Sequence, residues 1–200
     1  MDMTPQETIA YIGRMLFERR LTDFAGGNIS MRVGEEVFMT PRYSGAKQHW
    51  RVDPQTIVHG PLNTDDILDH PDFSREGKAH LAVYREFPSA TAIIHAHSFY
   101  VLPFCVAGRP MNPILEATEK FGVIEPLPFA PAHSMELANT VCEALRHKEE
   151  LITRFAAPLL LTRHGIFVVS TDLYRCLDAV ERINWNAWCV LAQGMLPQQP

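Results

Sequence analysis

The sequence of 200 residues has no apolar run long enough to cross a membrane and no run of basic residues. A membrane-spanning helix needs about 18 or more consecutive apolar residues, so a spanning helix is excluded. A formal net charge of -5 without a basic cluster also lacks the positive surface with which nucleic-acid-binding proteins contact phosphates. We therefore expect neither a membrane nor a nucleic acid as a partner.

Cysteine is scarce as well. The 4 cysteines are widely separated and form no C-x-x-C pair, which favours free thiols in a reducing compartment over a disulfide framework. Charged residues at Asp2, Glu7 and Arg14 interrupt the N-terminal segment before an apolar block forms, so no secretory signal is expected. We predict a cytoplasmic protein with one domain over residues 1–200, because 46% hydrophobic residues suit a single well-buried core.

Periodic apolar residues predict helices on both sides of a central mixed or antiparallel sheet. The first helix is expected over 5 to about 20, after the capping box Thr4-Pro5-Gln6-Glu7. Alternation around Gly34 predicts a β-hairpin, and the proline-interrupted stretch 41–71 predicts a long loop with a short strand near 56–58. Further helices are predicted from near Ser74 to 87, over 98–107 and 134–147, and from 171 or 172 to 192, and further strands over 92–97, 122–129, 159–163 and 167–170.

Two histidines end the apolar run at 92–97. Side chains at i and i+2 of a strand point to the same side, so His95 and His97 would present two imidazoles to one volume. A zinc site with an open position needs a third protein ligand, and the best candidate is His164, which ends another apolar run and precedes a glycine. We expect the two runs to be neighbouring strands that carry ligands at their ends. The alternative for the H-x-H pair alone is two hydrogen-bonded histidines near a strand end.

Two further segments could hold an anion. The backbone N–H groups of Gly26-Gly27-Asn28 can be left free before the hairpin, although the same residues would also form an ordinary tight turn. The N-terminus of the helix near Ser74 favours an anion through its free N–H groups. Glu76 lies in this first turn, either as a catalyst or as simple helix-end chemistry, and His80 one turn later is expected to be packed rather than a ligand.

Six short motifs occur along the chain. They are G-G-N-I-S at 26–30, T-P at 40–41, S-R-E at 74–76, I-I-H-A-H at 93–97, L-P-F-A-P at 127–131 and R-H-G at 163–165. In this order and spacing the chain resembles the class II aldolase/adducin family, whose enzymes act on sugar phosphates, and the likeness covers nearly the whole chain. The resemblance implies a three-layer α/β/α fold around a largely antiparallel mixed sheet, often assembled as a homotetramer with active sites between subunits.

The resemblance also implies roles for residues. It assigns zinc ligation to three histidines and acid/base catalysis to a glutamate that can also ligate the resting metal, namely His95, His97, His164 and Glu76. It implies that the substrate phosphate binds at Gly27, Asn28, Thr40, Ser74 and Arg75. A divalent cation that chelates a carbonyl and the adjacent hydroxyl spreads the charge of an enediolate, and a nearby carboxylate moves the proton at its carbon. We therefore expect a zinc-dependent aldolase that cleaves a ketose phosphate to dihydroxyacetone phosphate and an aldehyde.

The chain departs from the family in two places. Family aldolases often carry T-P-[ST]-G after the hairpin, whereas here Arg42 and Lys47 make the loop basic. These cations could contact phosphate, select a carboxylate or be solvated. Some aldolases of the family also carry a catalytic tyrosine that residues 112–125 lack, and Glu116 and Glu119 stand there instead. An epimerase, a dehydratase or a decarboxylase acting on a sugar phosphate or sugar acid at the same site therefore remains an alternative.

Two alternatives come from other classes of protein. A non-catalytic interaction module like the adducin head domain has no need of three histidines and a glutamate in these motifs. A metal-free hydrolase using Ser98 with His97 lacks the nucleophile elbow that such enzymes use. We therefore prefer the metal-dependent enzyme.

Overall fold

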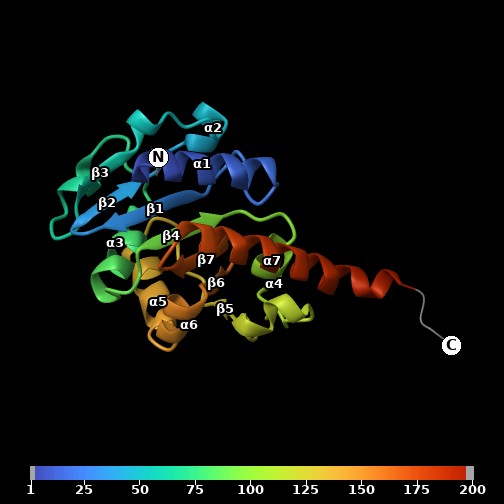
Figure 1. Ribbon diagram of the computed structural model, residues 1–200. Helices are drawn as coiled ribbons and strands as arrows, with labels where there is room; N and C mark the ends of the chain where they lie inside the picture. The colour runs from blue at the N-terminus through green and yellow to red at the C-terminus, as the bar shows by residue number, and fades with distance from the viewer. Residues whose placement is uncertain (1–2, 197–200) are drawn as a thin grey trace.

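The computed structural model describes residues 3–196, which form a seven-stranded sheet with helices on both faces (Figure 1). The strands are β1 (Asn28–Val33), β2 (Glu36–Met39), β3 (Val58–Pro61), β4 (Ala92–Ala96), β5 (Pro126–Leu127), β6 (Ala157–Leu161) and β7 (Gly165–Ser170). Their order across the sheet is β3-β2-β1-β4-β7-β6-β5. Neighbouring strands are antiparallel except for β5 and β6, which are parallel.

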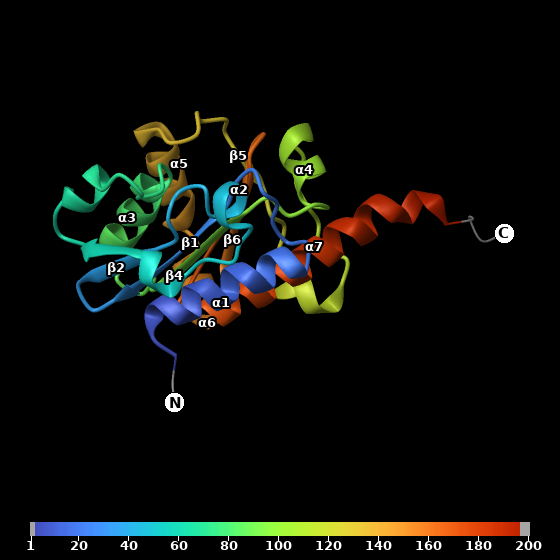
Figure 2. The same ribbon diagram turned by 90° about the horizontal axis from the view of Figure 1, so that it is seen from above.

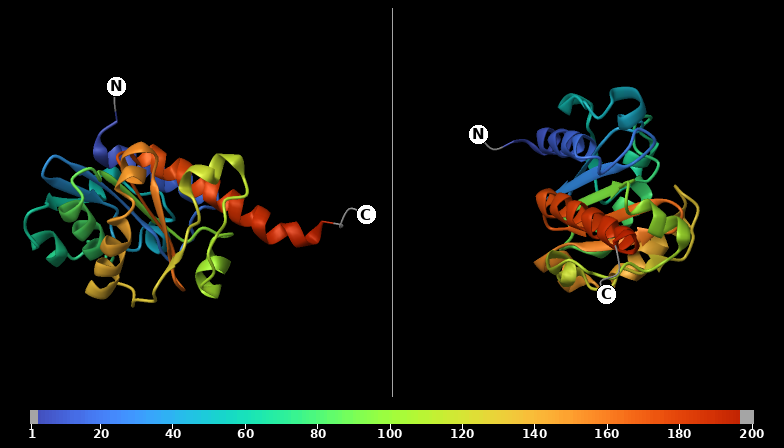
Figure 3. Two further views of the ribbon diagram at one scale, coloured as in Figure 1. Left: turned by 90° about the horizontal axis from the view of Figure 1, so that it is seen from below. Right: turned by 90° about the vertical axis from the view of Figure 1, so that its right-hand side faces the viewer.

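Two layers of helices cover the sheet. On one face α1 (Pro5–Glu18) and α7 (Leu173–Ala192) lie side by side, and the other face is covered by α3 (Gly77–Glu86), α5 (Met135–Leu145) and α6 (Glu149–Arg154) (Figures 2 and 3). The remaining helices are short, namely α2 (Ser44–Gln48) and α4 (Leu102–Ala107), with single 3-10 segments at 54–56, 66–69, 116–121 and 193–195. Within residues 3–196, no helix has both the length and the apolar character needed to cross a bilayer.

Side chains that alternate along the central strands divide the core into two clusters. In β4, Ile94 packs with the α1 and α7 side, whereas its neighbour Ile93 packs with the α3 and α5 side. Val168 and Phe167 repeat this alternation in β7. Both strands are therefore buried on both faces along their whole length.

The structure confirms the three-layer fold and several of its local determinants. Thr4 Oγ1 accepts a hydrogen bond from the N–H of Glu7, and the Glu7 carboxylate accepts one from the N–H of Thr4, so the predicted capping box starts α1. Asp172 caps α7 through the N–H groups of Tyr174 and Arg175. The β1–β2 hairpin turns at Gly34, whose φ of 60° suits glycine.

Other details differ from the prediction. The helix expected near Ser74 begins at Gly77, and the stretch 41–71 contains α2 and β3 rather than a single short strand at 56–58. The strand predicted over 122–129 shrinks to β5, because prolines at 126 and 128 cannot donate to a ladder. The expectation that the two histidine-bearing strands are neighbours is wrong: β7 lies between β4 and β6 and pairs with both.

Candidate metal centre

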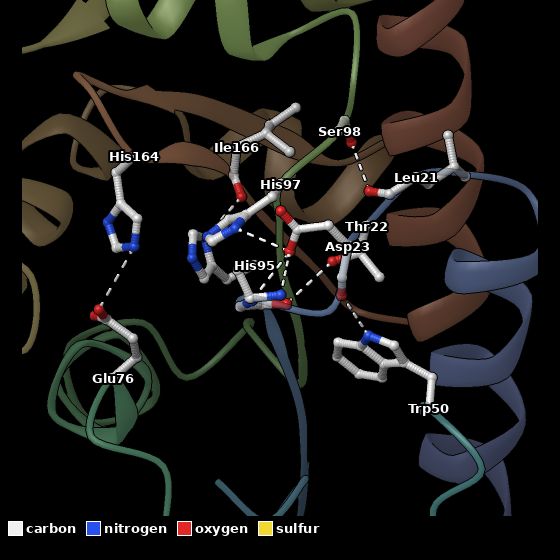
Figure 4. A network of polar contacts seen from close by, with 12 residues as sticks. Leu21, Thr22, Asp23, Trp50, Glu76, His95, His97, Ser98, His164 and Ile166 are labelled. Carbon is white, nitrogen blue, oxygen red and sulfur yellow. Dashed lines mark hydrogen bonds and ion pairs between the residues drawn. The ribbon is translucent and has the colours of Figure 1, made fainter. Parts of the chain in front are cut away.

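The three predicted ligands come together at one end of the central strands. His95 is in β4, His97 follows that strand by one residue, and His164 lies in the turn between β6 and β7. Because β7 runs antiparallel to β4, with Ile166 opposite Ala96, the turn before β7 lies where β4 ends. The ligand nitrogens of these histidines, here called the histidine triad, all lie within 4.8 Å of one another (Figure 4).

Polar partners contact two rings of the triad. His95 Nδ1 lies 3.0 Å from the carbonyl oxygen of Ile166, and because a carbonyl only accepts, Nδ1 carries the proton and Nε2 keeps its lone pair. His97 Nδ1 lies 3.3 Å from Oδ1 of Asp23. The same oxygen accepts hydrogen bonds from the N–H groups of Ala25 and Gly26, which fix the carboxylate. Metal-binding histidines are oriented in this way by a carbonyl or a carboxylate.

The nitrogens that face inward fit a metal ion. Nε2 of His95 and Nε2 of His97 are buried and have no hydrogen-bond partner among the residues that the structure describes. Burial lowers the pKa of His95 well below its usual value, and burial together with His97 and His133 lowers the pKa of His164 to about 4. These two imidazoles are therefore neutral near pH 7, as metal ligation requires.

Two glycines leave room for the rings. A Cβ atom on Gly26 would lie 2.2 Å from Cε1 of His97, and a Cβ atom on Gly165 would lie 2.5 Å from the carbonyl oxygen of Ala96. Any larger residue at either position would have to displace the chain or the imidazole beside it. The close packing of the triad therefore explains one glycine in each of two motifs, Gly26 in G-G-N and Gly165 in R-H-G.

Glu76 lies next to the triad, at the residue just before α3. Its Oε1 atom is 3.8 Å from Nε2 of His164 and 2.9 Å from Nδ1 of His133, and it accepts a hydrogen bond from the His133 N–H at 3.3 Å. Burial raises the pKa of Glu76 to about 7, against the opposing effects of that N–H and of Arg75. A carboxylate with such a pKa can both accept and donate a proton near neutral pH.

The structure brings most, but not all, of the predicted anion-binding residues into one pocket of about 180 Å³. Besides the triad and Glu76, the predicted residues that line it are Gly27, Asn28, Arg42, Ser74 and Arg75. Thr40 is fully buried, and its hydroxyl accepts a hydrogen bond from the N–H of Ile29. This residue therefore supports the strand rather than lining the pocket.

Tyr43 and His133 also line this pocket, and the sequence did not single them out. Arg42, Lys47 and Arg75 surround the Tyr43 ring, at 5.5, 4.9 and 6.0 Å from its centroid. These three exposed cations, here called the cationic rim, have no ion-pair partner within 4 Å among residues 3–196. The position of Tyr43 between Arg42 and Lys47 in the sequence is the pattern that could have indicated the rim.

Three other residues considered from the sequence have different surroundings. Ser98 is buried and its hydroxyl donates to the carbonyl oxygen of Leu21, which leaves the metal-free hydrolase without a nucleophile. Glu116 and Glu119 are exposed and lie outside the pocket lining. His80 is packed, as expected: its Nδ1 lies 2.7 Å from the Ser30 hydroxyl, and burial lowers its pKa to about 3.

The sequence profile of the family "Class II Aldolase and Adducin N-terminal domain" matches residues 7–191. The chain belongs to this family. Among its class II aldolase relatives, "L-fuculose phosphate aldolase" from Methanococcus maripaludis is 27% identical over 192 residues, covering 92% of this chain and 97% of the relative. The "3-oxo-tetronate 4-phosphate decarboxylase" of Haemophilus influenzae is 27% identical over 195 residues, covering 93% of this chain and 86% of the relative.

Solved structures agree with the family. A structure of "L-fuculose 1-phosphate aldolase" matches with a TM-score of 0.82 at 22% identity and covers 99% of this chain and 92% of that chain. At this identity the likeness establishes the class II aldolase fold. By their names, the two sequence relatives are an aldolase and a decarboxylase, and both act on a phosphorylated compound. The family therefore supports an enzyme and does not by itself select the reaction.

Proposed function

We propose that this class II aldolase family member is a zinc-dependent aldolase that cleaves a ketose phosphate to dihydroxyacetone phosphate and an aldehyde. The observation that carries the proposal is the histidine triad, whose inward nitrogens are free to bind an ion, with a single buried carboxylate beside it. Three nitrogen donors with an open fourth position suit zinc in a catalytic site. The aldolase relative supports the reaction type.

Each side of the pocket has a task in this reaction. Arg42 and Arg75 of the cationic rim, with Ser74, Gly27 and Asn28, bind the phosphate at one end of the pocket. A divalent ion held by the triad would supply Lewis-acid polarisation of the substrate carbonyl and would stabilise the negative charge that develops there. Because the phosphate is held by Arg42 and Arg75, the substrate carbonyl is oriented toward the triad.

Glu76 moves the proton on carbon. The Glu76 carboxylate takes the proton of the hydroxyl on the fourth carbon as the bond between the third and fourth carbons breaks. The fourth carbon thereby becomes the aldehyde, and the electron pair of the broken bond stays with the three-carbon fragment as an enediolate. That fragment becomes dihydroxyacetone phosphate only when its carbon gains a proton. A carboxyl group with a pKa of about 7 beside the triad is suited to deliver it and to take it back in the condensation direction.

We further propose that the enzyme works in the cytoplasm as a homo-oligomer, most simply a tetramer. The C-terminal part of α7 extends beyond the rest of the fold (Figure 1), and its Trp185 and Trp188 are 51% and 37% exposed. Exposed aromatic residues grouped on one element are typical of subunit interfaces. Light scattering of the purified protein measures the assembly, and a monomer would reject this part of the proposal.

A decarboxylase acting on a phosphorylated 3-oxo acid is the second candidate. The Haemophilus influenzae relative favours it, as does the lack of a tyrosine in 112–125. Glu116 and Glu119, the residues available there, do not line the pocket. Loss of CO2 and retro-aldol cleavage both leave an enediolate or enolate, so the same metal site serves either reaction.

Product analysis distinguishes the two reactions. The zinc-loaded protein would be incubated with a panel of ketose 1-phosphates and with a phosphorylated 3-oxo acid, and products would be identified by mass spectrometry. Dihydroxyacetone phosphate together with an aldehyde is the expected result. Release of CO2 from the oxo acid without any aldol cleavage would replace the aldolase by the decarboxylase.

A further inference from the structure

A buried tryptophan supports the loop that contacts His97. Trp50 is fully buried, and its indole Nε1 donates a hydrogen bond of 2.7 Å to the main-chain carbonyl oxygen of Asp23 (Figure 4). Asp23 belongs to residues 21–27, here called the Asp23 loop, which lead from α1 toward β1. Trp50 lies in none of the six motifs and does not line the pocket of the triad, so contact with a substrate does not explain it.

The Asp23 loop touches the His97 ring at two points. Oδ1 of Asp23 lies 3.3 Å from Nδ1 of His97. Farther along the loop, Gly26 packs so closely that a Cβ atom there would lie 2.2 Å from Cε1 of the same ring. The position of the loop therefore sets the position of one imidazole of the triad.

The indole is wedged between α1 and the end of the Asp23 loop. A Cβ atom at Gly13 of α1 would lie 3.0 Å from the indole Cε3, and one at Gly27 would lie 3.4 Å from Cζ2. This packing fixes the direction of the indole N–H. Because the N–H points at a main-chain carbonyl at a short distance, it restrains the backbone of Asp23 as well as its side chain.

The backbone that presents the indole is strained. The φ angles of His49 and Trp50 are 52° and 56°, so two consecutive residues occupy the left-handed region that bulky side chains rarely adopt. Their N–H groups close the end of α2 by donating to the carbonyl oxygens of Gly45 and Ser44, respectively. Such strain persists where the surrounding structure holds it, and here it directs a large side chain beneath the Asp23 loop.

We propose that Trp50 is a positioning residue that holds Asp23, and through it the His97 ring, in the orientation in which His97 binds the metal ion. The indole N–H fixes the main chain of Asp23, and the fixed main chain places the carboxylate against Nδ1 of His97. Groups that orient ligands in this way tune metal affinity. The inference rests on the metal site of the proposed function but not on the reaction, because it concerns only how tightly the ion is held.

Two substitutions at position 50 separate the hydrogen bond from the packing. Trp50→Phe keeps a six-membered ring but has no N–H. Trp50→His removes more of the ring volume but keeps a ring N–H in the same place, because histidine Nε2 and tryptophan Nε1 both stand two bonds from Cγ. Loss of packing alone predicts the larger defect in Trp50→His, since a larger cavity costs more. Loss of the hydrogen bond predicts the larger defect in Trp50→Phe.

Zinc affinity is measured by competition with a chelator, on proteins that circular dichroism shows to be folded. Trp50→Phe is expected to lower the affinity by about tenfold, the lower end of the range for residues that orient ligands, and Trp50→His should remain closer to the wild type. Tyr84→Phe is the matched control, because Tyr84 is fully buried in the other core cluster and its hydroxyl lies 2.7 Å from Oγ of Ser30. It should lose stability with its buried hydrogen bond but no zinc affinity.

A double-mutant cycle tests whether the effect passes through Asp23. Asp23→Asn removes the carboxylate that contacts His97. If Trp50 acts by placing that carboxylate, Trp50→Phe should lower zinc affinity far less in the Asp23→Asn background than in the wild type. The visible spectrum of bound Co2+, which depends on ligand geometry, should likewise shift in each single variant and show no further shift in the double variant.

A second variant reaches the same loop without altering the indole. A Cβ atom at Gly45 would lie 2.7 Å from the carbonyl oxygen of Phe24, so Gly45→Ala pushes the Asp23 loop away from α2. Zinc affinity is expected to fall here too, and the fall should again shrink in the Asp23→Asn background. This variant tests the inference if Trp50→Phe does not fold, and an unchanged affinity in Gly45→Ala would then overturn it.

Three results with the position 50 variants would overturn the inference. They are wild-type zinc affinity in Trp50→Phe, a weaker affinity in Trp50→His than in Trp50→Phe, and a double variant whose loss is the product of the two single losses. A wild-type protein that binds neither zinc nor cobalt would overturn the inference together with the proposed function. Affinities that follow the expected pattern in a protein that cleaves no ketose phosphate would support the inference, whereas the proposed reaction would fail.

Discussion

The histidine triad and two members of the cationic rim, Arg42 and Arg75, line the same pocket, but the triad and the rim are built in different ways. The triad lies at the end of strands that are buried on both faces, and fixed partners orient two of its rings. The rim consists of three exposed cations around Tyr43, on a short helix and loops. Positions of ligand atoms must be held within a few tenths of an ångström, whereas attraction of an anion tolerates mobile side chains. We expect substitutions in the triad to act on metal and chemistry, and those in the rim to act on affinity.

The largest effect is expected from His164→Ala. Loss of one of three protein ligands should lower zinc affinity by about 10³-fold or more, and turnover should disappear with the metal. Metal content measured after dialysis tests this expectation, with His147→Ala, an exposed histidine outside the pocket, as the control. A variant that retains zinc at the wild-type affinity would show that the triad is not the metal site.

Glu76→Gln separates metal binding from chemistry within the same region. The amide keeps the size of the side chain but cannot accept and return a proton, so kcat should fall by about 10²- to 10⁴-fold while zinc remains bound. Glu136→Gln, in the first turn of α5, is the matched control. Full activity in Glu76→Gln would reject the role of this carboxylate.

Asp23→Asn tests whether orientation matters as much as ligation. The carboxylate that contacts His97 Nδ1 becomes an amide, and zinc affinity is expected to fall by about 10- to 100-fold. Competition with a chelator gives the affinity. Asp53→Asn removes a similar turn-capping carboxylate that does not line the pocket and should leave the affinity unchanged. Equal affinities for both variants would contradict the orienting role.

The rim should respond differently from the triad. Arg42→Ala, Lys47→Ala and Arg75→Ala are each expected to raise KM by about tenfold, equivalent to ~1.4 kcal/mol, with kcat nearly unchanged and with an effect that weakens in high salt. Arg154→Ala removes an exposed cation on α6 as the control. Loss of kcat rather than a rise in KM would show that the rim takes part in the chemistry.

The last prediction concerns stability near neutral pH, where the effect is smallest. It involves His80, which packs against Ser30 of β1 and Phe167 of β7. Burial lowers its folded pKa to about 3, below the value of the unfolded chain, so its contribution to stability is complete above pH 6.5 and is lost as pH falls toward 3. The loss is about 1.4 kcal/mol per pH unit below 6.5. Urea denaturation of the metal-free protein at several pH values should show a shallower decline in His80→Asn than in the wild type or in His59→Asn. Equal slopes would contradict this burial effect.

The sequence predicted the parts of the site that depend on local spacing. His95 and His97 share one volume because a strand alternates its side chains, and the apolar run before His164 placed that residue at the end of a strand. The prediction that the strands ending near His95 and His164 are neighbours was wrong. The β6–β7 hairpin places β7 between β4 and β6, and residue spacing does not reveal the order of strands in a sheet. Thr40 was expected at the pocket but supports a strand. Tyr43 and His133 were missed because both lie in irregular segments without a periodic pattern, and the pocket that they line is assembled from segments far apart in the chain.

The turn between β6 and β7 places His164 nearly 70 residues along the chain from the two histidines that it meets. An ion bound by all three residues would cross-link two distant parts of the chain and close a long loop. No disulfide closes that loop. The unfolded chain lacks the histidine triad, so zinc binds the folded protein in preference. The melting temperature should therefore rise with the concentration of free zinc. The heat tolerance of this protein would then depend on how well its cell supplies the ion.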